Sequence, residues 1–359
     1  MKKHERPVVV YLFPHESSFI RTDKTILEKK YTVIPCLVGG QRRKVFYMFS
    51  LVRLFFFLLI RGACAKAFIC WFGDYHSFIM VLAARILRKK SIILIGGQES
   101  ICYKEFGKGV FCNKQRGRLL SWSFRHATLI IANHKSLLFH ENFYYDPEGK
   151  KDGILHYIPG LKTRVEVVHN GINADRFPSI PVEKKNPKMV LSVGHSEKMP
   201  DIILKGFDLL TGIARRNPRV EFVLVGIGSG IIDETIAKYG CTEIPNLTLV
   251  PFNLTNPIVD YFHKAKVYVQ ASITEGMPNT LSEAMLSNCI PVGSNVNGIP
   301  DAIGPAGIIV KKRDMTELEN AILLALKMET TNAPREYTLK NFTSEIREKK
   351  LLEIIGSVI

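Results

Sequence analysis

Short apolar runs alternate with helical patterns along the whole chain. Runs of four to seven residues rich in Val, Ile and Leu are typical of strands buried on both faces of a parallel sheet. Their alternation with helices predicts an α/β fold with two Rossmann-like parallel sheets. The predicted strands are Val8 to Phe13, Ala67 to Phe72, Ser91 to Gly96 and Thr128 to Ala132, then Met189 to Val193, Arg219 to Val225, Leu247 to Phe252, Val267 to Ala271, Ile290 to Gly293 and Gly307 to Val310.

The length of the chain predicts two domains. With 359 residues it exceeds the size at which a single core stops growing. Pro178, Pro181 and Pro187 punctuate a polar stretch that is typical of a domain boundary. We expect a first domain over 1–170 and a second over 171–340, with a C-terminal helix of about 341–359 packing back on the first. Because ligands of open parallel sheets sit at the carboxyl ends of the strands, the predicted active site is the cleft between the domains.

The net charge of +16 is confined to the first half of the chain. Residues 1–170 contain 28 Lys and Arg against 12 Asp and Glu, whereas residues 171–359 contain 21 of each. Such a basic domain is expected to meet an anionic membrane face or a nucleic acid. No recognised nucleic-acid motif occurs and the cations are dispersed among bulky aliphatic residues, so the sequence favours the membrane.

The cysteines and the N-terminus indicate the compartment. Seven scattered cysteines without any CxxC pair predict a reduced, cytoplasmic protein without disulfides or a zinc site. The stretch from Met1 to Pro14 has a basic start but no small-residue cleavage site, and we interpret it as a first strand instead of a signal peptide.

The longest apolar run, Val45 to Ile60, predicts a membrane-facing helix. Its 16 residues, interrupted by Arg53, fall short of the roughly 20 that a spanning helix needs. A helix lying in the interface of an anionic membrane fits better, on the inner face of the cell membrane. A buried helix between sheet and solvent is the alternative. The predicted membrane contacts are Arg42, Arg43, Lys44, Arg53, Phe55, Phe56 and Phe57.

The segment EGMPNTLSE places two carboxylates, Glu275 and Glu283, at the two ends of a turn that opens a helix. Pro278 suits the first helical turn, Asn279 and Thr280 suit its cap, and the backbone N–H groups there form an anion site. One carboxylate could hold sugar hydroxyls and the other a ribose, with phosphate between them.

Several segments, in this order, resemble the retaining, nucleotide-sugar-dependent glycosyltransferases of family 4, also called group 1, which have the two-domain GT-B fold. They are HNGINADRF, SVGHSEKMPDIILKGFDLL, VGIGSG and ASITEGMPNTLSEAMLSNCIPVGSNVNGIPDAI. The resemblance implies that Glu275 contacts donor-sugar hydroxyls and Glu283 binds the ribose. It implies that Lys205 clamps the diphosphate, so that Lys205 and Glu275 are the catalytic residues. Further implied donor-binding residues are His195, Gly206, Gly228, Gly276, Met277, Pro278, Asn279 and Thr280.

The chain departs from the family pattern at two places. His195 stands where an arginine is usual, and either His195 itself or Lys198 could supply the missing interaction. The first half lacks the family's glycine-glycine loop, but the small residues Ser17 and Ser18 still allow close approach. Candidate acceptor-side residues are Ser17, Ser18, His76, Gln98 and Glu99, each of which could instead be a polar loop residue or a helix cap.

The resemblance implies transfer of a hexosyl unit, with retention, from a nucleoside diphosphate sugar to a lipid-linked or saccharide acceptor. Such enzymes typically build capsule, lipopolysaccharide or related cell-surface polysaccharide and glycolipid. No Asp-x-Asp pair occurs, so we expect neither a metal nor another cofactor. The alternatives are a catalytically silent GT-B scaffold in a polysaccharide assembly complex and a soluble sugar-phosphate synthase of the same fold.

Overall fold

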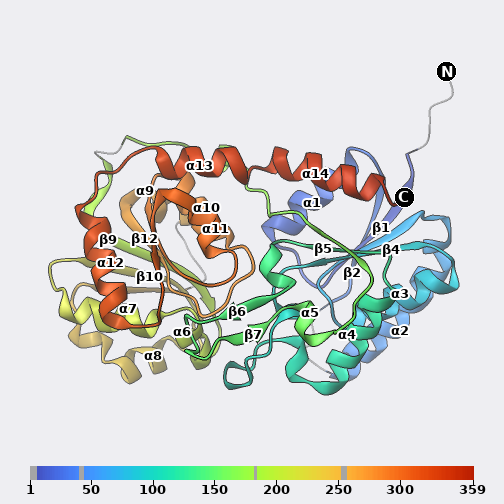
Figure 1. Cartoon of the computed structure of the whole chain (residues 1–359), viewed down its shortest axis with the longest axis horizontal. Helices are drawn as coiled ribbons and strands as arrows, with labels where there is room; N and C mark the ends of the chain where they lie inside the picture. The colour runs from blue at the N-terminus through green and yellow to red at the C-terminus, as the bar shows by residue number, and fades with distance from the viewer. Residues whose placement is uncertain (1–5, 40–43, 182–183, 252–256) are drawn as a thin grey trace. The chain divides into compact units, whose positions relative to one another are not determined.

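The computed structural model describes residues 6–39, 44–181, 184–251 and 257–359, which form two compact units (Figure 1). Unit 1 consists of Met1–His140, Asp152–Gly171 and Ser344–Ile359, and unit 2 of Glu141–Lys151 and Ile172–Thr343. The chain thus enters unit 2 briefly at Glu141–Lys151, a segment that the sequence predicts to lie in the first domain, and returns to unit 1 at its C-terminal end.

Unit 1 contains a six-stranded parallel sheet in the order β2-β1-β3-β4-β5-β8. Side chains of β1 alternate between two buried clusters, because successive residues of a strand point to opposite faces. The continuous apolar run that predicts this strand therefore reflects burial on both faces. The strands are β1 (Val8–Phe13), β2 (Thr32–Leu37), β3 (Ala67–Trp71), β4 (Lys90–Ile95), β5 (Leu129–Ala132) and β8 (Arg164–Val167).

Helices cover both faces of this sheet. Residues of α1 and α14 pack with Val9 and Tyr11 on one face, and residues of α2, α3 and α4 pack with Val10 and Leu12 on the other. The helices of unit 1 are α1 (Ser18–Glu28), α2 (Lys44–Ile60), α3 (Tyr75–Ile86), α4 (Lys114–His126), α5 (Ile154–Tyr157) and α14 (Ser344–Gly356).

The C-terminal helix α14 is held in unit 1 by a buried ion pair. Arg347 donates from Nε and Nη2 to both carboxylate oxygens of Asp23 in α1, at 2.5 and 2.7 Å, and both side chains are almost fully buried. Its Nη1 atom donates to the carbonyl oxygens of Val168 and His169, and Trp71 donates to the same carboxylate. Figure 1 shows α14 beside α1. Every polar atom of this pair is therefore matched, as a buried pair requires.

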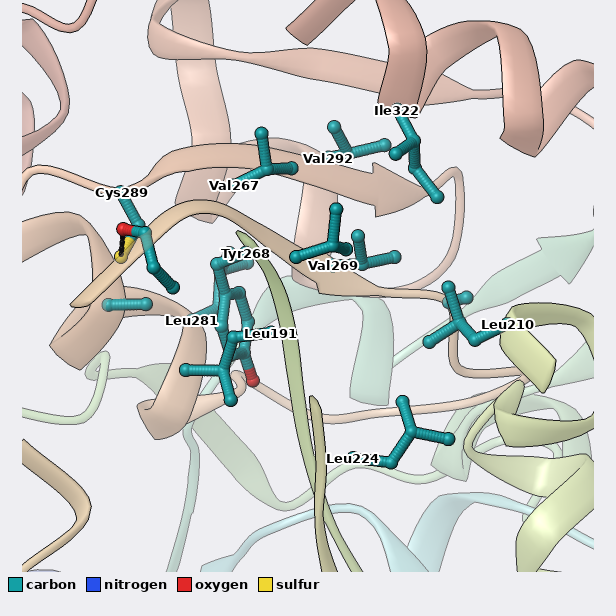
Figure 2. Close-up of a cluster of buried hydrophobic side chains, with 14 of the residues drawn as sticks. Leu191, Leu210, Leu224, Val267, Tyr268, Val269, Leu281, Cys289, Val292 and Ile322 are labelled. Carbon is teal, nitrogen blue, oxygen red and sulfur yellow. Dashed lines mark hydrogen bonds between the residues drawn. The ribbon is translucent and has the colours of Figure 1, made fainter. Parts of the chain in front are cut away.

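Unit 2 contains a second six-stranded parallel sheet, in the order β11-β10-β9-β12-β13-β14. Figure 2 shows strand residues such as Leu191 and Val292 meeting side chains of the flanking helices, among them Leu210, Leu281 and Ile322. The strands are β9 (Asn186–Ser196), β10 (Glu221–Ile227), β11 (Leu247–Pro251), β12 (Ala265–Gln270), β13 (Ile290–Ser294) and β14 (Ile308–Val310).

The helices of unit 2 follow its strands. They are α6 (Met199–Leu204), α7 (Phe207–Arg216), α8 (Ile232–Tyr239), α9 (Ile258–Lys264), α10 (Asn279–Leu286), α11 (Ile299–Ile303), α12 (Met315–Lys327) and α13 (Ala333–Asn341). A short two-stranded hairpin of β6 (His140–Asn142) and β7 (Lys150–Asp152) carries the Glu141–Lys151 segment. Two parallel sheets, each with helices on its faces, confirm the predicted α/β fold.

Candidate functional site

The loops after β9 and β12 carry the residues that the sequence predicts to bind the donor. In the sheet β9 lies beside β12, and from there the strand order runs to β10 on one side and to β13 on the other. Ligands of open parallel sheets bind outside the carboxyl ends of the strands at such a switch point. Lys205 lies in the connection after β9, and Glu275 lies in the loop after β12. The strand order and the sequence motifs therefore locate the candidate donor site at the same edge of the unit 2 sheet.

Lys205 and Glu275 form an ion pair at this switch point. The Nζ atom of Lys205 donates to Oε1 of Glu275, and the two side chains are only 20% and 18% exposed. The next residue, Gly206, has φ +75°, and a Cβ atom there would lie 2.5 Å from the carbonyl oxygen of Ala271 at the end of β12. Glycine is required at this position because it alone combines that conformation with so close an approach.

A hydrogen-bond network fixes the orientation of Glu275. Its Oε1 atom also accepts from Ser272 Oγ at 3.0 Å and from Gln270 Nε2 at 3.4 Å. Its backbone N–H donates to Oδ1 of Asn297, a residue in the left-handed conformation. Within the described part of the chain Oε2 has no such donor, so one oxygen of Glu275 holds the network and the other can accept from a ligand hydroxyl.

The hairpin segment Glu141–Lys151, which comes much earlier in the chain, contacts the loop of Glu275. Nδ2 of Asn142 donates to the carbonyl oxygen of Ile273 at 2.7 Å, and the hydroxyl of Tyr144 donates to that of Ala271 at 3.5 Å. The backbone of Arg313 in turn donates to Tyr144 at 2.9 Å. This support was missed by sequence reasoning, because nothing in the local pattern of the hairpin indicates that it joins the second unit.

Helix α10 carries the second carboxylate, Glu283. Partial burial raises the pKa of this carboxyl to about 7, and the charge of Arg176 partly opposes the shift. A carboxylate that is costly to ionise in the unliganded protein is suited to accept hydrogen bonds from a ligand, which would stabilise its charge.

The first turn of α10 differs slightly from the prediction. The helix begins at Asn279 with Pro278 as its N-cap residue, one position earlier than the sequence predicts, and no side chain caps it. Thr280 donates to Oε1 of Gln270 at 3.5 Å instead of capping. Because the first N–H groups of a helix lack partners within the helix, this uncapped turn next to Glu275 can receive an anion.

The loop between Glu275 and α10 can contribute to the donor site only through its backbone. The carbonyl oxygen of Gly276 accepts from the N–H of Gly298 at 3.0 Å, and the side chain of Met277 is buried in the core of unit 2. Met277 therefore anchors the loop, and only its backbone can face a ligand.

The glycine turn after β10 brings two strand ends together. Gly226 has φ +106°, and a Cβ atom there would lie 2.5 Å from the carbonyl oxygen of Gly194 in β9. The N–H of Gly228 donates to Ser196 at 2.7 Å. The sequence predicts Gly228 as the important glycine of this turn. The structure instead requires glycine at Gly226, where the backbone has a positive φ and the register of β10 shifts.

Of the two candidates for the missing arginine, His195 lies at the end of β9 and Lys198 lies just after that strand. The ring of His195 is exposed and lies 3.1 Å from the carboxylate of Glu197. Lys198 is an exposed residue at the start of α6, where its backbone N–H donates to Asp201. Their roles toward a diphosphate stay predictions.

In unit 1, two of the candidate acceptor-side residues have structural contacts. Glu99 is fully buried, and its carboxylate accepts from the N–H groups of Gly73, Gly96 and Gly97 at 2.8 to 3.3 Å. Burial raises the pKa of Glu99 against the effect of these donors. His76 is also buried, with its Nε2 atom 3.0 Å from the carbonyl oxygen of Trp71, and burial lowers its pKa. Glu99 thus ties together the loops after β3 and β4, and His76 ties the start of α3 to the end of β3.

The other candidates are residues that are partly or fully exposed, although the hydroxyl of Ser17 is itself buried. Gln98 is exposed and accepts from the N–H of Gly109 at 2.9 Å. Ser18 opens α1. The hydroxyl of Ser17, just before it, is buried with no partner in the described part of the chain. An unpaired buried hydroxyl is uncommon, and this one is available to contact a bound group.

Two further residues at this edge of unit 1 were missed by sequence reasoning. Phe72, directly after β3, has φ +66°, a strained conformation for a bulky residue. The ring of His15, in the loop after β1, stacks on it with centroids 5.6 Å apart. Both follow neighbouring strands at the switch point between β1 and β3, and they present an aromatic surface there. A backbone angle cannot be read from the sequence, so no local signal identifies Phe72.

Helix α2 has one buried and one exposed apolar face. Tyr47, Leu51, Leu54 and Leu58 are buried at helical spacing against the core of unit 1. On the opposite side Phe46, Met48, Phe49, Val52, Phe56 and Ile60 are all more than half exposed. The sequence offers two interpretations of this helix, a buried helix and a membrane-facing helix. The first describes the face of Leu51 and Leu54, and the second is compatible with the exposed face.

The predicted membrane contacts divide in the same way. Arg53 and Phe56 are exposed, whereas Phe55 and Phe57 are partly buried and pack against the core. Lys44 is the first residue of α2, and Arg42 and Arg43 lie outside the described residues. Among the helices that are described, none has the length and hydropathy needed to cross a bilayer.

Comparison with solved structures identifies the fold class. The chain resembles a sucrose-phosphate synthase from Thermosynechococcus elongatus, with a TM-score of 0.72 at 13% identity over 98% of this chain and 99% of the other. It also resembles Anabaena HepE in complex with UDP-glucose (0.70, 14%, 98% and 99%) and a glycosyltransferase from Rickettsia africae (0.69, 15%, 99% and 99%). The fold is therefore GT-B, as predicted.

Comparison with protein families identifies the second unit more closely. Residues 187–328 match the family described as Glycosyl transferases group 1, which confirms the group 1 resemblance of the second unit. The matched segment contains Lys205, Glu275 and Glu283. A search of curated protein sequences finds no match.

Proposed function

We propose that this protein is a glycosyltransferase that moves a hexosyl unit from a nucleoside diphosphate sugar to a lipid-linked acceptor, with retention of configuration. The observation that carries the proposal is the Lys205–Glu275 ion pair at the switch point of the unit 2 sheet, next to the first turn of α10. A cation, an oriented carboxylate and a helix N-terminus together match the charges of a sugar diphosphate.

Each part of the donor has a complementary group in this arrangement. The Oε2 atom of Glu275 accepts from sugar hydroxyls, and Glu283 accepts from those of the ribose. The first turn of α10 and the Gly276 backbone hold the diphosphate, and Nζ of Lys205 approaches the leaving phosphate. HepE has been solved with UDP-glucose, which makes uridine nucleotides the first donors to test.

The transfer needs charge stabilisation more than a nucleophile. The bond between the anomeric carbon and the phosphate oxygen breaks, and its electron pair stays on the diphosphate. The acceptor oxygen forms the new bond on the same face, and its proton passes to the leaving phosphate. Negative charge therefore grows near Lys205 as the sugar leaves, so Lys205 acts mainly on the rate.

The proposed acceptor and location rest on unit 1. The excess charge of +16 lies within residues 1–170, and α2 exposes an apolar face. Cations attract anionic headgroups, and exposed aromatic residues insert at the boundary with the acyl chains. We place the enzyme on the inner face of the cell membrane, in the synthesis of surface polysaccharide or glycolipid, without a metal or other cofactor.

Donor binding is the direct test. In calorimetry and thermal-shift screens, wild-type protein should bind one nucleoside diphosphate and its sugar, and Glu283→Ala should weaken that binding about tenfold or more, as expected for a hydrogen bond to a charged group. Glu329→Ala, which removes an exposed carboxylate of the same unit outside the predicted site, is the matched control. Unchanged affinity of the Glu283 variant for every nucleotide would overturn the ribose assignment.

Turnover separates the enzyme from its alternatives. Slow hydrolysis of the bound donor would exclude a silent scaffold, whereas binding without any turnover would favour it. The likeness to a sucrose-phosphate synthase keeps a soluble sugar-phosphate acceptor as the second candidate. Transfer to a sugar phosphate without vesicles would establish that candidate, and transfer only to extracted lipid would establish the first. Full activity after treatment with EDTA is expected.

A further inference from the structure

The surface of unit 1 contains an apolar pocket between α2, α3 and α4. Its volume is about 380 Å³, within the usual range for ligand sites, and its lining contains no polar side chain except that of Tyr75. Residues from all three helices line it, among them Val52 and Phe55 of α2, Phe78 and Ile79 of α3, and Leu119 of α4. The pocket opens beside the exposed apolar face of α2, where Met48 and Val52 belong to both features.

A second pocket, of about 440 Å³, lies on the other side of α4 and has the opposite character. Lys114, Arg118 and Arg125 line it together with Trp122 and with the stacked rings of Phe111 and Tyr157, whose centroids are 4.4 Å apart. Lys114 and Arg118 are exposed, and neither has an ion-pair partner in the described part of the chain. This pocket therefore presents cations that an anionic group can neutralise.

The two pockets are neighbours. Arg118 of the basic pocket and Leu119 of the apolar pocket are consecutive residues of α4. The ring of Trp122, in the basic pocket, packs on that of Phe78, in the apolar pocket, with centroids 5.0 Å apart. An apolar chain and an anionic group on one molecule could therefore occupy both pockets.

The charges of the three helices favour an anionic occupant. α2, α3 and α4 contain no Asp or Glu. Two carboxylates near these helices are already engaged. Asp74 at the start of α3 pairs with Arg116 at 2.7 Å, and Asp152 accepts from the hydroxyl of Tyr157, which lines the basic pocket, at 3.0 Å. A second copy of this chain would bring the same cations to this face, and the two copies would repel each other. The cations of the three helices are Lys44, Arg53, Arg85, Lys114, Arg116, Arg118 and Arg125.

We infer that the two pockets bind a single anionic membrane lipid, with a hydrocarbon chain between α2 and α3 and the charged headgroup on Lys114 and Arg118. The inference rests on the proposed membrane docking and deepens it, because a lipid held in a pocket fixes the position of unit 1 at the membrane, which a flat apolar face does not. Each methylene group that leaves water strengthens binding about fourfold, so even a partly inserted chain supplies substantial affinity.

The chain has its own reporter for this lipid. Only two tryptophans occur, of which Trp71 is buried inside unit 1 and Trp122 lies between the two pockets. Bromine atoms on an acyl chain quench tryptophan fluorescence at short range. Vesicles of phosphatidylglycerol brominated on the acyl chains should therefore quench Trp122 in the full-length protein, and equally brominated phosphatidylcholine should quench it much less.

Matched variants separate the pocket from the flat face. Val52→Phe fills the mouth of the pocket and keeps the face apolar, so it should remove the quenching while co-sedimentation with vesicles persists. Ile60→Phe also introduces a phenylalanine on the exposed face of α2, but outside the pocket lining. It should leave both the quenching and the co-sedimentation unchanged. Lys114→Gln with Arg118→Gln should reduce quenching by phosphatidylglycerol to the phosphatidylcholine level. Circular dichroism checks that each variant is folded.

The outcomes distinguish this inference from the proposed function. Vesicle binding without quenching would overturn the lipid pocket and leave membrane docking intact. Absence of vesicle binding would overturn both, while nucleotide binding would still support the donor site. A concentration-dependent dimer that Val52→Phe disrupts, seen by sedimentation velocity, would show that a second copy covers the pocket, and it would overturn the inference.

Discussion

Lys205 is the residue whose loss is expected to slow transfer most selectively. Among the described residues it is the cation that pairs with Glu275, and the charge that it stabilises grows only as the sugar leaves. Lys205→Ala should lower kcat about a hundredfold, on the scale of losing one preorganised donor, with a smaller change in donor affinity. Lys188→Ala, at an exposed lysine of β9, is the control, and Lys198→Ala tests the other lysine that is a candidate for the diphosphate. Loss of rate in the Lys198 variant alone would transfer the role to that residue.

Glu283 is expected to make both stability and nucleotide binding depend on pH. Its pKa is raised from 4.5 to about 7 in the folded protein, so the stabilisation from keeping it neutral is complete below about pH 4.5 and is lost as the pH rises through 7. The melting temperature of Glu283→Gln should therefore exceed that of the wild type increasingly from pH 5 to pH 8.

Nucleotide affinity should change in the opposite sense. The ionised carboxylate is the better acceptor for ribose hydroxyls, so wild-type affinity for the bound nucleotide should rise between pH 6 and pH 8. Calorimetry on Glu283→Gln supplies the baseline, since it retains the ionisation of the phosphates but not that of Glu283. If the nucleotide affinities of the wild type and of Glu283→Gln changed with pH in parallel, the assignment of Glu283 to the ribose would be contradicted.

Single residues differ in how far the sequence predicts them. Lys205 and Glu275 stand in motifs, and the structure brings them into contact although they are separated by 70 positions. Phe72 and Gly226 could not be predicted, because their importance lies in backbone angles that the three-dimensional fold imposes. Glu99 has the polarity of a ligand-binding residue, but its carboxylate is consumed by three backbone donors, which only the structure reveals.

At the scale of elements, the junction of α1 and α14 should depend on the buried pair of Asp23 and Arg347. Arg347→Met leaves the carboxylate buried without its partner and should cost about 3–5 kcal/mol in the free energy of unfolding of unit 1. The double variant Asp23→Leu with Arg347→Met should cost less, because no buried charge is left. Chemical denaturation measures both.

The same two helices provide a control for that experiment. Lys29, just after α1, pairs with Glu348 of α14 at 2.6 Å, but its side chain is 54% exposed. Lys29→Met should therefore change the free energy of unfolding by less than about 1 kcal/mol. An equal loss in both variants would show that proximity of the helices, and not burial of the charge, determines the cost.

The exposed face of α2 should determine vesicle binding without affecting stability. Phe49 and Phe56 are 71% and 55% exposed, so replacing both by serine should release the protein from anionic vesicles while leaving the melting temperature nearly unchanged. Leu324→Ser, on an exposed site of α12 that is 55% accessible, is the control. Phe55 and Phe57 are unsuitable for this test, because they pack against the core and their replacement would also lower stability. Retained vesicle binding by the double variant would exclude this face as the anchor.

In unit 1 the sequence predicts the central strands but misses both edge strands, for a physical reason. All ten predicted strands have counterparts in the sheets, whereas β2 and β8, at the two edges of the unit 1 sheet, were missed. Residues of β2 are mostly partly exposed, and Pro35 interrupts its apolar run, which is tolerated at an edge. Neither strand forms the continuous apolar run that indicates burial on both faces.

At the scale of the whole molecule, charge asymmetry predicts how salt acts on the protein. The net charge of +16 belongs to residues 1–170, and residues 171–359 are neutral. The Debye length falls from about 10 Å at 0.1 M salt to about 3 Å at 1 M, and each cation near an anionic bilayer contributes about 1 kcal/mol. Raising NaCl from 0.1 to 0.5 M should therefore weaken binding to anionic vesicles about tenfold or more, as measured by co-sedimentation.

Two comparisons determine what that salt effect means. Weak binding to phosphatidylcholine vesicles should be nearly independent of salt, because the apolar face of α2 acts there without headgroup charge. A short DNA or RNA duplex should not displace the protein from anionic vesicles at 0.15 M salt. Displacement by the duplex, together with failure to bind any nucleoside diphosphate sugar, would assign the basic half to nucleic acid instead. A salt-independent affinity for anionic vesicles would mean that the aromatic face alone anchors the protein, and the basic residues would then need another anionic partner.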